Sequence, residues 1–182
     1  MPQENFLEAL KKEGLDCARR PTGGGILFHM TDLAFSVLVP SSHAGYSTNT
    51  LANYAYINNK VTEAIHKWSG NRLSPVLLSK QAEKRSTFCM AQPTQYDVMI
   101  DGKKVGGAAQ RRMKQGFLHQ GTISLWPPSE ELLKKILLPG SEILEEMQKN
   151  SYFLLSQDLP LHERLQAKKD LRLAMEAVFL QN

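Results

Sequence analysis

Two glycine-rich basic segments contain the residue types best suited to chemistry. Residues 19–29 read Arg-Arg-Pro-Thr-Gly-Gly-Gly-Ile-Leu-Phe-His, and residues 101–110 read Asp-Gly-Lys-Lys-Val-Gly-Gly-Ala-Ala-Gln. Glycines let backbone N–H groups approach an anion closely, and Arg20 and Lys104 add formal positive charge. Each segment also borders an apolar stretch. The pattern predicts a site for a ligand with an anionic head and an apolar tail.

Two side chains in or near these segments are candidates for a direct chemical role. Lys104 follows the tight turn at residues 101–102, and a preorganised ammonium stabilises negative charge in a transition state. Gly106 and Gly107 leave room for the reacting group. Cys89 is either a nucleophile activated by nearby cations or a small apolar core residue, and Cys17 is predicted to lie in the core.

Two histidines lie on predicted strands of the same region. His29 ends the first segment, and His119 lies on the strand after the second. Each is either a group that orients a ligand or a hydrogen-bonded core residue, and the sequence leaves both interpretations open.

Composition excludes several classes of protein. The chain has 182 residues, of which 42% are apolar, and a net charge of +4. No run approaches the roughly 20 apolar residues of a membrane span, and the first residues lack a secretory signal pattern. Two cysteines are too few for a disulfide framework, so we expect a cytoplasmic protein. The basic cluster at 103–114 lacks interleaved aromatic residues, which disfavours nucleic acid as a partner.

Apolar periodicity and Gly/Pro punctuation place these residues on a sheet-rich core followed by a helical part at 129–182. The predicted strands are 15–19, 26–29, 33–39, 76–78, 95–100, 105–111 and 117–125. The predicted helices are 4–13, 51–68, 129–138, 141–149 and 161–179. This order indicates a mixed α/β domain.

At this point the motifs resemble a known family. Residues 19–29 are similar to the lipoate-binding loop of lipoate–protein ligases, and residues 101–110 resemble the catalytic-lysine segment of that family. Residues 118–123 resemble the strand that follows. Residues 89–93, before Tyr96-Asp97, resemble the cysteine loop found in some ligase-like members and in the related cysteine-dependent octanoyltransferases. The resemblance runs from about residue 15 to 125. It implies the biotin/lipoate ligase catalytic fold, a mixed and largely antiparallel sheet with flanking helices, similar to class II aminoacyl-tRNA synthetases and biotin synthetase.

The resemblance implies an enzyme of lipoylation. Its main implication is an ATP-dependent lipoate–protein ligase: lipoate (or octanoate) reacts with ATP, brought in with Mg²⁺, to give an acyl-adenylate, which a lysine of a lipoyl carrier domain then attacks. The implied carriers are the lipoyl domains of 2-oxoacid dehydrogenase complexes or the H protein of glycine cleavage. The first alternative is an octanoyltransferase that holds the acyl group as a thioester on Cys89 without ATP. The second is a catalytically impaired remnant that binds lipoate or a carrier.

Roles carry over to matching positions of this sequence. Lys104 is the implied catalytic residue, joined by Cys89 only in a transferase, and no residue is assigned to a protein-held metal. The implied substrate-binding residues are Arg20, Thr22, Gly23, Gly24, Gly25, His29, Gly106, Gly107, Ala109, His119 and Gly121.

Two departures from the family pattern stand out. The family usually has an Asp directly after the Phe-His pair, whereas Met30 stands there in this chain and Asp32 is the nearest carboxylate. Family members also usually carry a longer segment before the glycine-rich loop. We therefore expect residues 1–182 to form a single catalytic domain that is shortened at its N-terminus.

Overall fold

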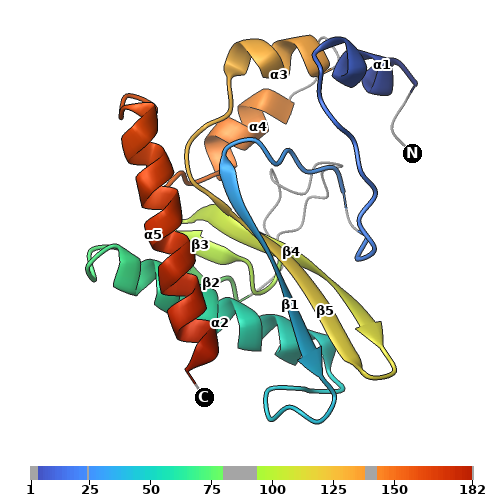
Figure 1. The fold of residues 1–182 in the computed structure, drawn as a ribbon, viewed down its shortest axis with the longest axis vertical. Coiled ribbons are helices and arrows are strands. Elements are labelled where there is room, and N and C mark those ends of the chain that lie inside the picture. Colours follow the sequence, from blue (N-terminus) through green and yellow to red (C-terminus); the bar gives the residue numbers. More distant parts are fainter. Residues whose placement is uncertain (1–3, 24, 80–93, 138–142, 182) are drawn as a thin grey trace.

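The computed structural model describes residues 4–23, 25–79, 94–137 and 143–181 (Figure 1). Its centre is a five-stranded sheet in the order β1-β5-β4-β3-β2, in which every neighbouring pair is antiparallel. The strands are β1 (Asp32–Pro40), β2 (Val76–Leu77), β3 (Val98–Ile100), β4 (Lys103–Met113) and β5 (Gly116–Ser124).

Two long helices cover one face of this sheet, α2 (Thr50–Trp68) and α5 (Leu161–Leu180). In Figure 1 the two helices cross one another at a steep angle. The main core lies between these layers, where Ile65 and Leu171 from the helices pack with Val105 and Ile123 from the strands. Burial of such side chains supplies about 1.5–3 kcal/mol each. Helix α5 thus shares its core with the sheet and is not a separate unit.

Three shorter helices gather at one end of the molecule (Figure 1). They are α1 (Glu4–Lys12), α3 (Glu130–Ile136) and α4 (Ile143–Asn150). A second apolar cluster holds them together through Phe6, Leu133 and Met147. The cluster also includes Phe28, so it anchors the connection between α1 and β1.

This connection differs from the sequence prediction. Neither 15–19 nor 26–29 forms a strand; apart from one isolated bridge at Ile26, the chain makes turns and irregular structure there. Gly23 has φ +73°, which interrupts an extended path. Cys17 lies in this segment and is exposed, so its predicted burial is wrong. The predicted strand at 95–100 begins only at Val98.

A β-bulge shapes the start of β4. Val98 pairs with Gly106 and Met99 pairs with Lys104, so Val105 has no partner of its own on β3. Val105 points into the core beneath the helices. The extra residue changes the alternation of faces along β4. As a result, Lys104 shares a face with Gly107 rather than with Gly106.

Candidate functional site

The face of the sheet opposite α2 and α5, which we call the open face, carries polar side chains. Antiparallel partners share a face, and Thr122 pairs with both Ala34 and Gly107. Gln120 pairs in the same way with Ser36 and Ala109. The connection before β1 is tied to this face, because Thr22 Oγ1 lies 2.9 Å from Gln120 Oε1.

A cavity of about 250 Å³ lies between this connection and strands β1 and β5. Its polar lining comes from Arg20, His29, Ser36 and Gln120, and Leu27 contributes an apolar wall. Arg20 also donates from Nη2 to the carbonyl of Gly25 at 3.4 Å, a contact within its own loop.

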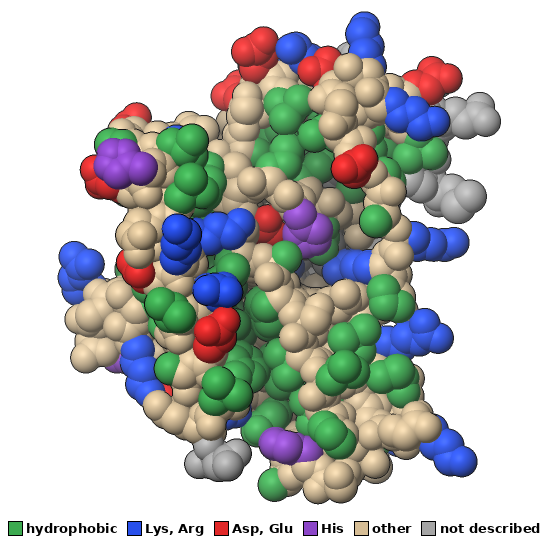
Figure 2. Space-filling model, in the orientation of Figure 1, with side chains coloured by type: hydrophobic (Ala, Val, Ile, Leu, Met, Phe, Trp, Pro, Cys, Tyr) green, Lys and Arg blue, Asp and Glu red, His purple; other side chains and the backbone are tan. Residues whose placement is uncertain are grey.

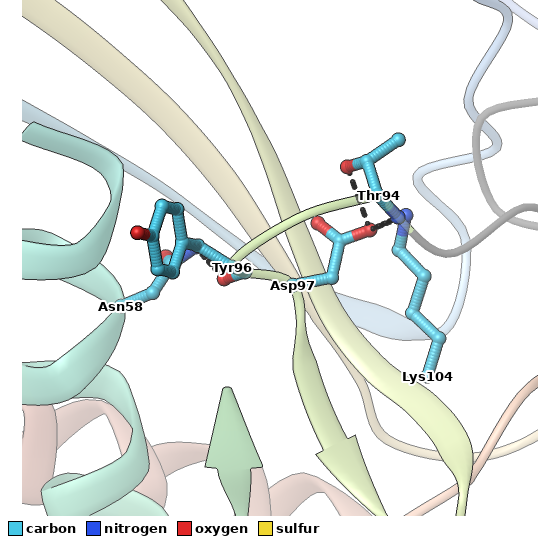
Figure 3. A network of polar contacts seen from close by, with 5 residues as sticks. All are labelled: Asn58, Thr94, Tyr96, Asp97 and Lys104. Atoms are coloured by element: carbon cyan, nitrogen blue, oxygen red, sulfur yellow. Dashed lines mark hydrogen bonds and ion pairs between the residues drawn. The ribbon is translucent and has the colours of Figure 1, made fainter. Parts of the chain in front are cut away.

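Lys104 lies on the same face and is paired with an acid. Its Nζ is 2.8 Å from Asp97 Oδ2, and both side chains are only 4% exposed (Figure 3). The pair therefore fixes a positive charge at a defined position on the open face.

Asp97 is itself held by its neighbours. Thr94 donates to Asp97 Oδ2 twice, from its backbone N at 2.7 Å and from Oγ1 at 3.0 Å. Between them Tyr96 adopts φ +68°, a conformation that is uncommon for a non-glycine residue. Asn58 of α2 stabilises this turn by donating to the Tyr96 carbonyl at 2.7 Å, as Figure 3 shows.

Gly107 provides the space in which Lys104 lies. A Cβ atom at position 107 would be 2.5 Å from Lys104 Cε and 2.7 Å from its Nζ. It would also be 3.1 Å from Asp97 Oδ1. The room that we expected Gly107 to leave for a reacting group is occupied by the Lys104 side chain. Only glycine at this position allows the ion pair its present geometry.

A second polar group joins β1 to β5 on the open face. His29 Nδ1–H donates to Asp32 Oδ2 at 2.7 Å, and Thr122 Oγ1 donates to the same carboxylate oxygen. Asp32 is 8% exposed at its side chain, whereas His29 is 49% exposed and lines the cavity. The hydrogen bond that His29 donates to Asp32 is the largest influence on the ring and raises its pKa above 6.5, while partial burial and the charge of Arg20 oppose this shift.

His119 lies on the other face of the sheet, beneath the helices. It is fully buried, stacks on Phe35 at 5.9 Å and meets the Tyr54 ring edge-on at 5.7 Å. Gln110 Nε2 is 2.8 Å from its Nδ1, while His119 Nε2 and Gln110 Oε1 have no hydrogen-bond partner within the described structure. Burial lowers the pKa of His119 to about 3, so the ring is neutral at physiological pH.

The predicted site residues thus divide between the two faces. Arg20, Thr22 and His29 gather at the cavity, and Lys104 with Gly107 lies on the same face. Ala109 shares this face through its pairing with Gln120.

The remaining predicted residues lie elsewhere or outside the described ranges. Gly106 and His119 lie on the face of the sheet that the helices cover. A Cβ atom at Gly121 would meet the Phe35 ring, although the backbone of Gly121 borders the cavity. Gly23 forms a left-handed turn beside the loop. Gly24 and Cys89 fall outside the described residues.

Sequence reasoning gave no site role to Asp97, Thr94, Thr122 or Gln120. One signal was available for two of them: Gln120, Thr122 and Ser124 are alternate polar residues on an otherwise largely apolar strand. This spacing marks one face of β5 as polar. The pairing of Asp97 with Lys104 depends on the bulge in β4 and on the left-handed turn at Tyr96. Neither feature produces a periodic pattern in the sequence.

Two classes of feature are absent from the described part of the chain. No group of three or more His, Cys, Asp or Glu side chains is arranged to hold a metal ion there. Among the described helices, none combines the length and apolar character that a membrane-spanning segment needs.

Comparison with known proteins identifies relatives of this architecture. A model of the biotin/lipoate A/B protein ligase family matches residues 2–126. Among solved structures, lipoate-protein ligase A bound with ATP superposes with a TM-score of 0.59 at 19% identity, covering 97% of this chain and 72% of that one. The bi-partite lipoate protein ligase of Thermoplasma acidophilum gives a TM-score of 0.61 at 21% identity, over 95% and 61%. These similarities confirm the predicted fold class.

The similar curated proteins are octanoyltransferases named LipM. That of Geobacillus kaustophilus is 31% identical over 81% of this chain and 55% of its own length. Those of Halalkalibacterium halodurans and Bacillus subtilis are 28% and 29% identical, over 97% and 80% of this chain and 63% and 54% of theirs. The chain therefore spans 54–63% of the length of these relatives.

These names correct one expectation. The ATP-dependent lipoate–protein ligase that the motifs implied is wrong as the main interpretation, because the curated relatives are octanoyltransferases. Lysine segments of the two kinds of protein look alike at the level of motifs. The features that pointed to a transferase were the cysteine loop at residues 89–93 and the pair Ala109-Gln110.

Proposed function

The chain belongs to the biotin/lipoate A/B protein ligase family, and we propose that within this family it is a cysteine-dependent octanoyltransferase. The observation that carries this proposal is its similarity, over four fifths or more of its length, to proteins named octanoyltransferase LipM. The buried Lys104–Asp97 pair supports it, since a fixed cation suits thioester chemistry.

The proposed reaction has two acyl-transfer steps. The Cys89 thiolate attacks the carbonyl carbon of an octanoyl thioester on a carrier, a new C–S bond forms, and the donor leaves as a thiolate. The ε-amine of a lysine on an apo lipoyl domain then attacks the octanoyl–Cys89 thioester. A C–N bond forms, the amine nitrogen gives up a proton to solvent, the C–S bond breaks, and Cys89 is released as a thiolate.

In this scheme Lys104 acts through its charge. Both steps place negative charge on a carbonyl oxygen and on sulfur, and a nearby ammonium stabilises such charge. Asp97 and Thr94 hold the ammonium in place, so the site pays little reorganisation energy when the charge develops. Lys103, the neighbouring lysine, is exposed and has no part in the scheme.

Chain connectivity supports Cys89 as the nucleophile. Thr94, which hydrogen-bonds to Asp97 beside Lys104, follows Cys89 by five residues. The proposed reaction also needs a free thiol, which a reducing cytoplasm preserves.

ATP and Mg²⁺ do not enter this reaction. A ligase uses ATP to activate a free carboxylate, whereas a thioester already carries an activated acyl group. Octanoate reaches the site as the thioester, and lipoate is the cofactor whose attachment the reaction serves.

The proposed acceptor is a lipoyl domain. One structural neighbour was solved in a study of a lipoate protein ligase and its E2 lipoyl domain, which supports this class of partner. Exposed basic residues at the β4–β5 hairpin, Arg111, Arg112 and Lys114, offer a surface for an acidic domain. Figure 2 shows Lys and Arg side chains along the edge of the molecule where Figure 1 places this hairpin.

Trapping of the acyl-enzyme tests the proposal. The protein is mixed with octanoyl–acyl carrier protein in the absence of acceptor, and its intact mass and peptide map are measured. We expect one octanoyl group on Cys89, lost in Cys89→Ser and retained in Cys17→Ser, which removes an exposed thiol. An octanoyl group that persists in Cys89→Ser, or none on the unaltered protein, would contradict the assignment.

A further inference from the structure

Apolar side chains gather on the open face of the sheet near the β4–β5 hairpin. Leu38 of β1 pairs with Leu118 of β5, so their side chains lie next to each other on this face. In the neighbouring row Pro40 and Met113 both pair with Gly116, which has no side chain to separate them. We call Leu38, Pro40, Met113 and Leu118 the hairpin patch.

The hairpin patch is open to solvent. Leu38 is 69% exposed and Met113 is 38% exposed. Pro40 is also exposed, and Leu118 is half-buried. Single exposed apolar side chains are ordinary, but apolar side chains that lie together on a surface mark a site for a partner.

Basic side chains border the hairpin patch. Arg111 pairs with Leu118 and therefore lies on the same face of the sheet. Arg112 and Lys114 follow at the hairpin, and all three basic residues are exposed. Figure 2 shows hydrophobic side chains next to Lys and Arg side chains along this edge of the molecule.

The two segments that form this end of the molecule contain no acidic residue. Residues 33–62 and residues 102–129 have neither Asp nor Glu. The segments meet here, because the backbone N of Ser41 donates to the carbonyl of Gln115 at 2.7 Å. The surface around the hairpin patch is therefore positively charged, and its electrostatic complement is an acidic partner.

The hairpin patch borders the cavity on the open face. Ser36 and Gln120 line the cavity and occupy the row of the sheet next to Leu38. Rows on one face are two residues apart, which is about 7 Å along the strands. Arg111 Nη1 also donates to the carbonyl of Pro21 at 3.5 Å, so the glycine-rich loop reaches the basic border of the patch.

The combination of an apolar centre and a charged border is typical of a protein–protein interface. Nucleic acid fits the centre poorly, because single-stranded bases stack on aromatic side chains and the hairpin patch has none. An acidic protein domain uses both parts of the surface. The proposed reaction supplies such a partner, since the acceptor lysine belongs to a lipoyl domain.

We propose that the hairpin patch is a docking surface for the acidic lipoyl domain. Leu38 and Met113 pack against apolar side chains of the domain, and the neighbouring arginine and lysine side chains face its carboxylates. This inference rests on the proposed function for the choice of partner. It places part of the interface on β1, a strand that contributes none of the basic residues.

Binding measured without an acyl donor tests the inference. An ¹⁵N-labelled apo lipoyl domain is titrated with the protein and followed by NMR, at about 0.05 M and about 0.5 M salt. Leu38→Gln removes an apolar contact and adds no charge, so we expect the Kd to rise about tenfold at both salt concentrations. Lys114→Gln should raise the Kd mainly at low salt, where charge attraction is least screened. Leu173→Gln, at a 54% exposed leucine of α5, is the matched control and should leave the Kd unchanged.

Three results would overturn the inference. The first is equal affinity of Leu38→Gln and the unaltered protein for the domain, or no change in the spectrum of the domain at any protein concentration. The second is an equal loss of affinity in Leu173→Gln, which would indicate a general effect on the fold. The third is a dimer of the unaltered protein, seen by sedimentation equilibrium, that Leu38→Gln dissociates, because the partner would then be a second copy of this chain.

The two proposals fail in different experiments. Trapping of octanoyl–Cys89 needs no lipoyl domain, and the titration needs no acyl group. If the acyl-enzyme forms and Leu38→Gln binds the domain normally, only the docking surface is wrong. If no acyl-enzyme forms and Leu38→Gln still weakens binding, the proposed reaction fails and the docking surface stands.

Discussion

At the residue scale, Lys104 owes its position to a side chain that one neighbour lacks and to a charge that another supplies. Gly107 has no side chain where the Lys104 ammonium lies, and Asp97 supplies the opposite charge. Thr94 in turn satisfies Asp97. The sequence singled out Lys104 and Gly107 as candidates because both fall in one motif, but the space at Gly107 holds the Lys104 side chain and not a reacting group. The sequence did not predict the role of Asp97, because the approach of its carboxylate to Lys104 depends on backbone geometry and not on residue spacing.

Gly107→Ala tests this arrangement. The added methyl group would fall within 2.7 Å of Lys104 Nζ, so the side chain must move away from Asp97. We expect octanoyl transfer to fall by about 10²-fold, the usual cost of a misplaced electrostatic group, in a protein that still folds.

Gly70→Ala is the control for the stability effect of such a change. Gly70 follows α2 with φ +63° and has nothing within 4 Å of its Cβ direction, so alanine adds backbone strain far from the site. We expect a lower melting temperature and unchanged transfer kinetics. Equal activity of Gly107→Ala and the unaltered protein would show that the position of Lys104 is unimportant.

At the scale of elements, sequence periodicity predicted most of the fold. The helix predicted at 51–68 and the tight turn predicted at 101–102 are local features, and both predictions are confirmed. The connection before β1 was predicted as two strands and is not. Its conformation is set by tertiary contacts, such as Thr22 with Gln120, which lies 98 residues away, and these leave no local signal.

The layer between the sheet and the helices makes a prediction about stability. His119 lies buried there with a pKa of about 3, whereas an unfolded chain has its histidines near 6.5. Between these values the unfolded state binds a proton that the folded state does not. The free energy of unfolding should therefore fall as pH drops, by about 2 kcal/mol between about pH 7 and about pH 5.

Urea denaturation of His119→Phe checks this. The variant lacks the titrating ring. Between about pH 7 and about pH 5, its free energy of unfolding should therefore fall by about 2 kcal/mol less than that of the unaltered protein. His162→Phe removes an exposed histidine and should behave like the unaltered protein. Parallel pH profiles for His119→Phe and the unaltered protein would rule out this origin of acid sensitivity.

At the scale of the whole molecule, the two faces of the sheet have different tasks. One face builds the core with α2 and α5, and the other presents the cavity and the Lys104 pair. Sharing of one core by the sheet and α5 supports our proposal that residues 1–182 act as a single catalytic domain. Motif resemblance correctly predicted this fold class, but its choice of ligase over transferase was wrong. Ligases and transferases of this family share the fold, so the fold alone does not distinguish the two reactions.

The basic edge makes a prediction about partner binding. Arg111 and Lys114 are exposed at the β4–β5 hairpin, and an acidic lipoyl domain would approach them through charge attraction. The double charge reversal Arg111→Glu with Lys114→Glu should raise the KM for the domain several-fold and leave kcat nearly unchanged. Lys169→Glu on α5 is the control. If the double variant and the unaltered protein have the same KM for the domain at every salt concentration, this edge does not contact the domain.

The most direct test of the account is the intact mass of an apo lipoyl domain incubated with this protein in two parallel reactions. One contains octanoyl–acyl carrier protein without ATP, and the other contains lipoate with ATP and Mg²⁺. We predict an octanoyl mass gain on the domain in the first reaction alone, lost in both Cys89→Ser and Lys104→Met. A gain that requires ATP, or one that survives Cys89→Ser, would contradict the account.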